Sequence, residues 1–161
     1  INHINDFPQD LEGKQVAVIG GGAVGLDVVE FFAARKADIS IVEMMDQIGR
    51  DLDPVTKNDT RCMMKKHGVH QLTKTALLEV KADSFLVKGS EGEYELPFDY
   101  GFVCLGMRAK GQLYPQLLDA FADDDVEIIN IGDSQRARRI IDGTMEGRNI
   151  LYHLTQRGYL D

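Results

Sequence analysis

The stretch QVAVIGGGAVGLDVVEFFA, from Gln15 to Ala33, decides the fold. It opens with the run QVAVI before the first glycine, in which four of the five residues are apolar and three are β-branched, and this run predicts a short, fully buried strand. Three successive glycines then predict a turn. After them, apolar residues recur at helical spacing and predict a helix from Ala23 to Lys36. These apolar positions are Val24, Val28, Phe31 and Phe32.

The following residues repeat the alternation of strand and helix. Ile39–Glu43 is predicted as a second buried strand and Val69–Leu72 as a third. Between them, Asp53 is a suitable N-cap and Pro54 a suitable first residue for a helix that ends near His67. This order of elements predicts a right-handed parallel sheet, and so an α/β fold with a Rossmann-like sheet and helices on both faces.

The pattern changes after the third strand. Three extended runs, Thr75–Val80, Ser84–Lys88 and Tyr94–Phe98, are separated only by short polar loops. Loops of this length connect hairpins and not helical crossovers, so a three-stranded antiparallel β-meander is predicted. The remaining predicted elements are a buried strand at Tyr100–Leu105, a short helix at Tyr114–Phe121, an acidic loop at Asp123–Asp125, a buried strand at Val126–Ile131 and a helix from Arg136 to Gln156.

These elements suggest three parts: a linker at residues 1–13, a nucleotide-binding domain at 14–122, and a C-terminal strand and helix at 123–161. A length of 161 residues allows one full domain and little else. The chain opens on Ile1 and not on Met. We therefore expect it to be an excised piece of a larger protein.

Composition narrows the class of protein. The formal charge of −8 argues against a nucleic-acid surface, which needs clustered Lys and Arg. No apolar run approaches the roughly 18 residues that span a bilayer, so no membrane partner is expected. Cys62 and Cys104 form neither a metal-binding spacing nor a disulfide framework, which predicts a reducing, cytoplasmic setting and no metal site.

The glycine turn carries the chemistry. It fits the pattern G-x-G-x-x-G, with Gly20, Gly22 and Gly25 in the three key positions. The first glycine permits the tight turn, the second lets backbone approach a pyrophosphate, and the third allows close packing of helix on strand. Amides near Ala23 and Val24 would face the phosphates at the start of the helix. An ordinary strand-to-helix turn is the alternative for these glycines.

An acid at the end of the second strand completes the dinucleotide pattern. Glu43 lies 18 residues beyond Gly25 and can accept hydrogen bonds from both hydroxyls of an adenosine ribose. Its charge would repel a 2′-phosphate, and positions 44–49 hold no Lys or Arg, so NADH is favoured over NADPH. Arg50 could counter this preference if its loop swings inward. A solvated strand end is the alternative for Glu43. No catalytic nucleophile with its base is found.

The sequence resembles the C-terminal part of flavin-dependent enoate reductases, the NADH:flavin oxidoreductases related to 2,4-dienoyl-CoA reductase and old yellow enzyme. The resemblance rests on four stretches: VAVIGGGAVGLDVVEFFA, ISIVEMMDQIGRDLDPVT, FVCLGMR and INIGDSQRARRIIDGTMEG. It implies a parent with a TIM barrel that carries FMN and an iron–sulfur cluster. The barrel is joined to a module of the disulfide-reductase type that holds FAD and an inserted NAD(P)H domain.

The resemblance also assigns residues beyond the glycine turn and Glu43. It implies that Gly106 lies against the dinucleotide and that Gly132 and Asp133 contact the ribityl chain of FAD. Asp27 occupies a position near the nicotinamide that relatives usually fill with Glu. The glycine fingerprint of the FAD site is missing from these residues, so the FAD contact would be incomplete here.

The function expected from sequence is an NADH-binding domain that positions nicotinamide for hydride transfer to FAD in such a parent. Its partners would be the dinucleotide and the FAD-binding and TIM-barrel domains, with self-association possible for the isolated piece. The alternative is a non-enzymatic, dinucleotide-sensing regulatory domain, for example of a transporter. A regulatory doubly wound domain would continue with helical crossovers after the third strand, whereas residues 75–98 read as hairpins. A methyltransferase is a third, weaker option.

Overall fold

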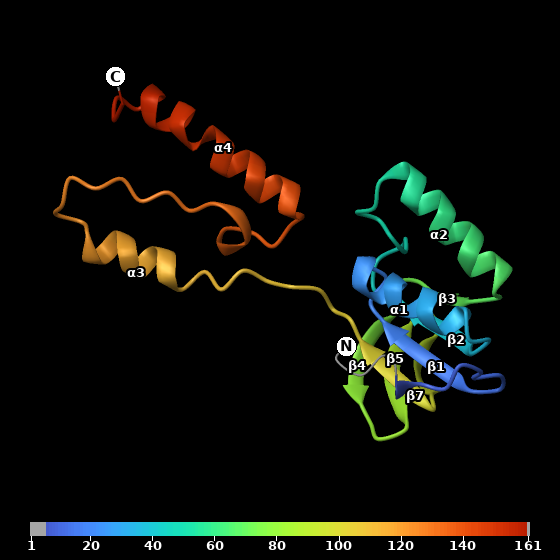
Figure 1. Cartoon of the computed structure of the whole chain (residues 1–161). Coiled ribbons are helices and arrows are strands. Elements are labelled where there is room, and N and C mark those ends of the chain that lie inside the picture. The colour runs from blue at the N-terminus through green and yellow to red at the C-terminus, as the bar shows by residue number, and fades with distance from the viewer. Residues whose placement is uncertain (1–5, 161) are drawn as a thin grey trace. The chain divides into compact units, whose positions relative to one another are not determined.

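A computed structural model describes residues 6–160 of the chain. It divides into two compact units, Ile1–Gly106 and Met107–Asp161. Figure 1 shows the sheets in the first unit, whereas the second unit consists of helices and extended segments. The division falls at Gly106, so residues 107–122, which the sequence pattern groups with the nucleotide-binding domain, belong to the second unit.

The first unit is built on a parallel sheet of four strands in the order β3–β2–β1–β7. The strands are β1 (Gln15–Ile19), β2 (Asp38–Val42), β3 (His70–Leu72) and β7 (Tyr100–Val103). Strand β1 lies at the centre, paired in parallel with both β2 and β7. The carboxyl ends of these three strands therefore meet at one edge of the sheet.

Helix α1 (Ala23–Ala33) packs on one face of this sheet. Every second side chain of β1 and β2 points toward the helix, because successive side chains of a strand alternate between the two faces of the sheet. Val16, Val18 and Ile41 are almost fully buried there with Phe32 of the helix. The helix ends before the predicted Lys36, which adopts a left-handed conformation (φ 62°) and so leaves the helix.

Helix α2 (Pro54–Lys66) starts as predicted. The Asp53 carboxylate caps it by accepting hydrogen bonds from the backbone N–H groups of Val55 and Thr56, at 3.0 and 3.1 Å. The Thr56 hydroxyl also donates to this carboxylate and is the main cause of the lowered pKa of Asp53. Helix α2 contacts α1, and its Met64 joins the core between α1 and the sheet.

The opposite face of the parallel sheet is covered by a second, three-stranded antiparallel sheet. Its strands are β4 (Ala76–Val80), β5 (Ser84–Gly89) and β6 (Gly92–Pro97), in that order. Phe85 and Val87 of β5 are fully buried with Ala17, Ile19 and Val42 of the parallel sheet. The predicted α/β fold class with a parallel sheet and a β-meander is confirmed. Helices cover one face of the parallel sheet and not both as expected, because on this face the meander takes the place of a covering helix.

The second unit contains α3 (Leu113–Ala120), a 3₁₀ turn η2 (Gly132–Ser134) and α4 (Ile140–Gln156). The predicted strand at Val126–Ile131 is wrong: the segment is not in a sheet. A strand needs a partner for its backbone hydrogen bonds, and among its described residues the second unit has none. None of the described residues of this unit is buried.

The predicted start of the last helix at Arg136 is also wrong. Helix α4 begins at Ile140, because the Asp142 carboxylate accepts a hydrogen bond from the Arg139 backbone N–H at 3.1 Å and caps the helix there. The residues before it are held outside the helix, with the Arg138 backbone N–H donating to the Asp133 carboxylate at 3.3 Å.

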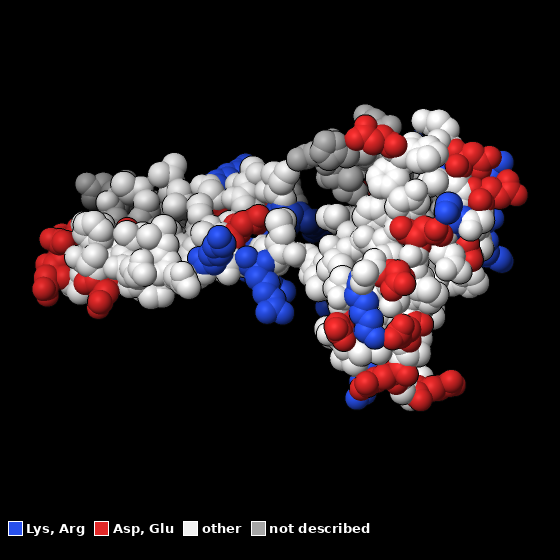
Figure 2. Space-filling view, turned by 90° about the horizontal axis from the view of Figure 1, so that it is seen from below, with Lys and Arg blue, Asp and Glu red and all other residues white. Residues whose placement is uncertain are grey.

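Among residues 6–160, no helix is both long enough and apolar enough to cross a membrane. Figure 2 shows acidic and basic side chains interspersed over the visible face of the first unit, without a continuous basic patch on that face.

Candidate dinucleotide-binding site

The glycine turn lies at the carboxyl edge of the parallel sheet, where β1 passes into α1. Two backbone hydrogen bonds fix its surroundings: Gly20 N–H donates to Val42 C=O at 2.8 Å, and Cys104 N–H donates to Ile19 C=O at 2.7 Å. The ends of β2, β1 and β7 are thus tied together around the turn. Ligands of open α/β sheets bind at this edge.

The three motif glycines have different surroundings. Gly20 has a positive φ of 108°, and a Cβ there would lie 2.3 Å from the Cys104 carbonyl oxygen. A Cβ at Gly25 would lie 1.9 Å from the Gly20 carbonyl oxygen. These two positions require glycine for the packing of the protein itself. A Cβ at Gly22 would meet nothing within 4 Å, so Gly22 borders open space that a ligand can occupy.

The start of α1 offers hydrogen-bond donors to that space. Gly22 is the N-cap residue and has no side chain to cap the helix, and the first turn contains no acidic residue. Ala23 and Val24 are exposed. The first amides of a helix lack intrahelical acceptors and carry the positive end of the helix dipole. This end of α1 therefore fits a pyrophosphate.

Glu43 directly follows β2, and its carboxylate is held by two backbone amides. Gly21 N–H donates to Oε2 at 2.7 Å, and Met45 N–H donates to Oε1 at 2.8 Å. Each carboxylate oxygen can accept more than one hydrogen bond, so both keep capacity for a further donor. The carboxylate is oriented but not saturated, which fits recognition of two neighbouring ribose hydroxyls.

The first basic residue after Glu43 along the chain, Arg50, is directed elsewhere. Its Nε lies 3.6 Å from the carboxylate of its neighbour Asp51, in an exposed ion pair. The loop before Arg50 is anchored by Gly49, whose N–H donates to Gly21 C=O at 2.7 Å. In this conformation no ion pair links Arg50 to Glu43.

Gly106 and Asp27 belong to different elements around the glycine turn: Gly106 follows β7, and Asp27 is on α1. Gly106 follows β7 closely, after the Cys104 carbonyl that packs on Gly20, and it adopts a positive φ of 78° with open space around it. Asp27 lies on α1 and lines a cavity of about 340 Å³ between α1 and α2, together with Glu30. Glu43 does not line that cavity.

Gly132 and Asp133 form the turn η2 in the second unit, where a glutamate of α4 holds them. Glu146 Oε2 accepts a hydrogen bond from Gly132 N–H at 2.6 Å, and Glu146 Oε1 pairs with the Arg138 guanidinium. These two contacts, the Gly132 amide first, lower the pKa of Glu146. Within residues 107–160 no glycine turn follows a strand, because the described residues there form no strand.

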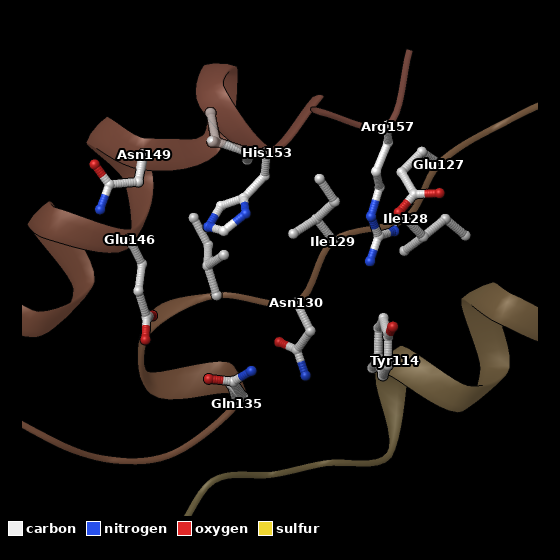
Figure 3. A pocket seen from close by; sticks show the side chains of 12 residues that line it. Tyr114, Glu127, Ile128, Ile129, Asn130, Gln135, Glu146, Asn149, His153 and Arg157 are labelled. Carbon is white, nitrogen blue, oxygen red and sulfur yellow. Dashed lines mark hydrogen bonds and ion pairs between the residues drawn. The ribbon is translucent and has the colours of Figure 1, made fainter. Parts of the chain in front are cut away.

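The second unit also contains a hollow of about 480 Å³ that sequence patterns did not indicate (Figure 3). It lies between the extended segment 127–131 and α4. Figure 3 shows the His153 side chain projecting from α4 into the hollow, while Arg157 pairs with Glu127. This ion pair neutralises two of the charged groups that line the hollow.

The side chains that could bind a metal are scattered over the described part of the chain. No cluster of three or more His, Cys, Asp or Glu side chains could hold a metal there. Cys62 is exposed on α2, and burial raises the pKa of the Cys104 thiol. Residues 6–160 therefore do not fit an iron–sulfur cluster.

Sequence patterns identified Gly20, Gly22, Gly25 and Glu43, and the structure brings these four positions to one edge of the sheet. They did not identify Gly21 or Met45, which hold the Glu43 carboxylate. Both act through backbone amides, which every non-proline residue possesses, so no side-chain signal could have revealed them.

Comparison with known proteins identifies the family. A sequence model of the family described as pyridine nucleotide-disulphide oxidoreductase matches residues 1–133. The chain belongs to this family. Membership agrees with the parallel sheet, the glycine turn and the antiparallel sheet described above.

Individual relatives are larger oxidoreductases. The chain is 32% identical over 142 residues to bilirubin reductase of Mediterraneibacter gnavus, an alignment that covers 86% of this chain and 21% of that protein. It is 26% identical to NADH oxidase of Thermoanaerobacter brockii, with 88% and 21% covered. The chain thus spans about a fifth of these relatives' length. A structure of 2-naphthoyl-CoA reductase shares the fold, with a TM-score of 0.65, 21% identity, and 91% and 22% of the two chains covered.

Proposed function

We propose that this chain is the NADH-binding domain of a larger flavin-dependent oxidoreductase and that it positions nicotinamide for hydride transfer to FAD. The observation that carries the proposal is the Glu43 carboxylate, held by two backbone amides beside the open start of α1. Family membership and the similarity to an NADH oxidase support it.

The residues of the chain would bind and orient the dinucleotide. The amides of Gly22, Ala23 and Val24 would donate to the pyrophosphate, and Glu43 would accept from the adenosine ribose hydroxyls. Gly106 would lie against the dinucleotide, and Asp27 would lie toward its nicotinamide half. The nicotinamide supplies the hydride when bound, and the protein contributes binding and orientation.

We propose NADH as the preferred nucleotide because a 2′-phosphate would meet the Glu43 carboxylate. A cation beside the 2′-phosphate would relieve this repulsion. Arg50 does not supply it in this conformation, because its guanidinium pairs with Asp51. Two unit charges about 4 Å apart near a protein surface interact by about 4 kcal/mol before screening by salt, so the discrimination should be readily measurable.

The parent is proposed to resemble the enoate reductases, with FAD, FMN and an iron–sulfur cluster outside the residues described here and with cytoplasmic location. Gly132 and Asp133 would form one edge of its FAD site. The antiparallel sheet β4–β6 argues against the regulatory alternative, because a regulatory doubly wound domain would have helical crossovers after β3.

The test is isothermal titration calorimetry of the 161-residue chain with NADH and with NADPH. We expect NADH to bind more tightly, Gly22→Val to abolish binding of both nucleotides, and Glu43→Ala to narrow the difference between them. Circular dichroism of Gly22→Val would check that the fold persists. Equal affinities for the two nucleotides would overturn the role of Glu43, and normal binding by a folded Gly22→Val would place the phosphate site elsewhere.

We also expect the isolated chain not to retain FAD after gel filtration, because one edge of a site offers few contacts against an association cost of at least roughly 4 kcal/mol. An absorbance spectrum of the protein peak, with and without added FAD, measures this. Stoichiometric flavin in the peak would show a complete FAD site within these 161 residues.

A further inference from the structure

The Glu43 carboxylate also contacts the glycine turn itself. Its Oε2 accepts the Gly21 N–H at 2.7 Å, the shorter of its two backbone contacts. Gly21 sits between the two glycines that lead into the open space at α1. We infer that Glu43 is a positioning residue for the pyrophosphate-binding turn, in addition to any contact with the ribose. This inference rests on the proposed function.

Both polar groups of Gly21 are directed into the protein. Its N–H is taken by Glu43, and its C=O accepts the Gly49 N–H at 2.7 Å. A Cβ at Gly21 would lie 3.0 Å from Glu43 Oε2 and 3.2 Å from the Ile48 side chain, and the residue is buried. The backbone of Gly21 is therefore held by hydrogen bonds on both sides of its Cα. With Gly21 fixed in this way, the next amides of the turn stay available to a ligand at Gly22.

These contacts of Gly21 are in turn supported by the loop between β3 and β4. Met45 N–H holds the second oxygen of the carboxylate, and the carbonyl groups of Glu43 and Met45 accept hydrogen bonds from the N–H groups of Thr75 and Lys74. Lys74 reaches this position with a left-handed backbone (φ 52°). The carboxylate thus transmits the position of the loop at residues 73–75 to the glycine turn.

The two roles of Glu43 can be separated with a ligand that has no ribose hydroxyls to recognise. A carboxylate that acts only on the ribose is irrelevant to an NADH analogue whose adenosine ribose lacks both hydroxyls. A carboxylate that positions the turn still affects binding of that analogue, because the pyrophosphate is unchanged.

The experiment measures dissociation constants of NADH, NADPH and the dideoxy analogue by ¹H–¹⁵N titration of the whole chain. We expect Glu43→Ala to weaken binding of the dideoxy analogue by at least about fivefold, since it removes the hydrogen bond that the Gly21 N–H donates to a charged acceptor. Asp38→Ala is the matched control, because it removes one exposed carboxylate from the opposite end of the same strand. The control should leave this affinity within about twofold.

Glu43→Gln provides the conservative rescue. Its single side-chain oxygen can still accept the Gly21 N–H, although its NH₂ group cannot accept the Met45 N–H, and its neutral amide no longer repels a 2′-phosphate. We expect it to keep affinity for the dideoxy analogue within about threefold of the unmodified chain, to keep the Gly21 amide resonance near its original position, and to narrow the preference for NADH over NADPH. If folded Glu43→Ala binds the dideoxy analogue as tightly as the unmodified chain does, the positioning role of Glu43 is overturned. Absence of NADH binding by the unmodified chain would instead overturn the proposed function.

Discussion

The two units of the chain differ in how their apolar residues are buried. The first unit encloses two clusters, one between α1 and the parallel sheet and one between the two sheets. In the second unit no described residue is buried, and large apolar side chains such as Ile140 and Leu151 are 91% and 64% exposed. Hydrophobic burial is the dominant favourable contribution to folding. The first unit can therefore be stable by itself, whereas the second needs a covering surface.

The same contrast separates the two candidate cofactor regions. In the first unit the glycine turn is supported by three strand ends and by the Glu43 carboxylate. In the second unit the turn at Gly132 is supported by Glu146 and by the close approach of Gly143, whose Cβ would lie 3.5 Å from the Gly132 Cα. A site on rigid, buried elements is positioned more accurately than one on an exposed turn. Dinucleotide binding is therefore the function expected of the isolated chain.

Truncation of one apolar side chain in each unit tests the contrast most strongly. Phe32→Ala should lower the free energy of unfolding by about 3–5 kcal/mol, because Phe32 is fully buried between α1 and the sheet. Leu151→Ala should change it by less than about 0.5 kcal/mol, since this side chain is mostly exposed. Chemical denaturation followed by circular dichroism measures both. Equal losses would show that the second unit buries Leu151 against a surface, for example in a self-associated form.

A pair of glycine substitutions sharpens the comparison within the first unit. Gly25→Ala should destabilise the fold by about 1–3 kcal/mol or more, because the new methyl group would lie 1.9 Å from the Gly20 carbonyl oxygen. The new methyl group of Gly22→Ala would point into open space, and the extended backbone of Gly22 accepts alanine. The loss of unfolding free energy should therefore stay below about 1 kcal/mol. Thermal unfolding compares the two variants. A larger loss for Gly22→Ala would contradict the assignment of packing to Gly25 and ligand space to Gly22.

Sequence predicted the first unit well because its signals are local. Helical spacing of apolar residues located α1, Asp53 and Pro54 located the start of α2, and short polar loops located the meander. The larger failures lie in the second unit, whereas in the first unit α1 ends at Ala33 and not at the predicted Lys36. Val126–Ile131 has the composition of a buried strand, but a strand forms only with a partner, and composition does not report whether one is present. The sequence pattern places the start of the last helix at Arg136, whereas the Asp142 cap fixes the start at Ile140.

The candidate site was predicted only as far as side chains and glycines reveal it. The G-x-G-x-x-G spacing and Glu43 pointed to the carboxyl edge of the sheet, where the structure places them together. The hydrogen bonds from Gly21 and Met45 to Glu43 arise from tertiary folding of two backbone amides. The same holds for the Gly49 contact, which depends on the path of a loop that has no periodic pattern.

The smallest expected effect concerns acid sensitivity in the second unit. The folded-state pKa of Glu146 is lowered by the Gly132 amide and by Arg138, so its contribution to stability is present above its unfolded pKa of about 4.3 and is lost as the pH falls through the folded value. The Gly132 amide resonance should shift in this acid range and should not shift in Glu146→Gln. A Gly132 resonance that is insensitive to pH would remove Glu146 as the support of this turn.

The central claim is that the dinucleotide binds at the carboxyl edge of the parallel sheet in the first unit. A ¹H–¹⁵N titration of the chain with NADH tests it most directly, because it reports every amide at once. The account predicts that the largest shifts fall on the Gly22, Ala23 and Val24 amides and on Met45 beside Glu43. Largest shifts at the hollow of the second unit, for example at Gln135 and His153, would contradict it, as would saturating NADH without any shift in the glycine turn.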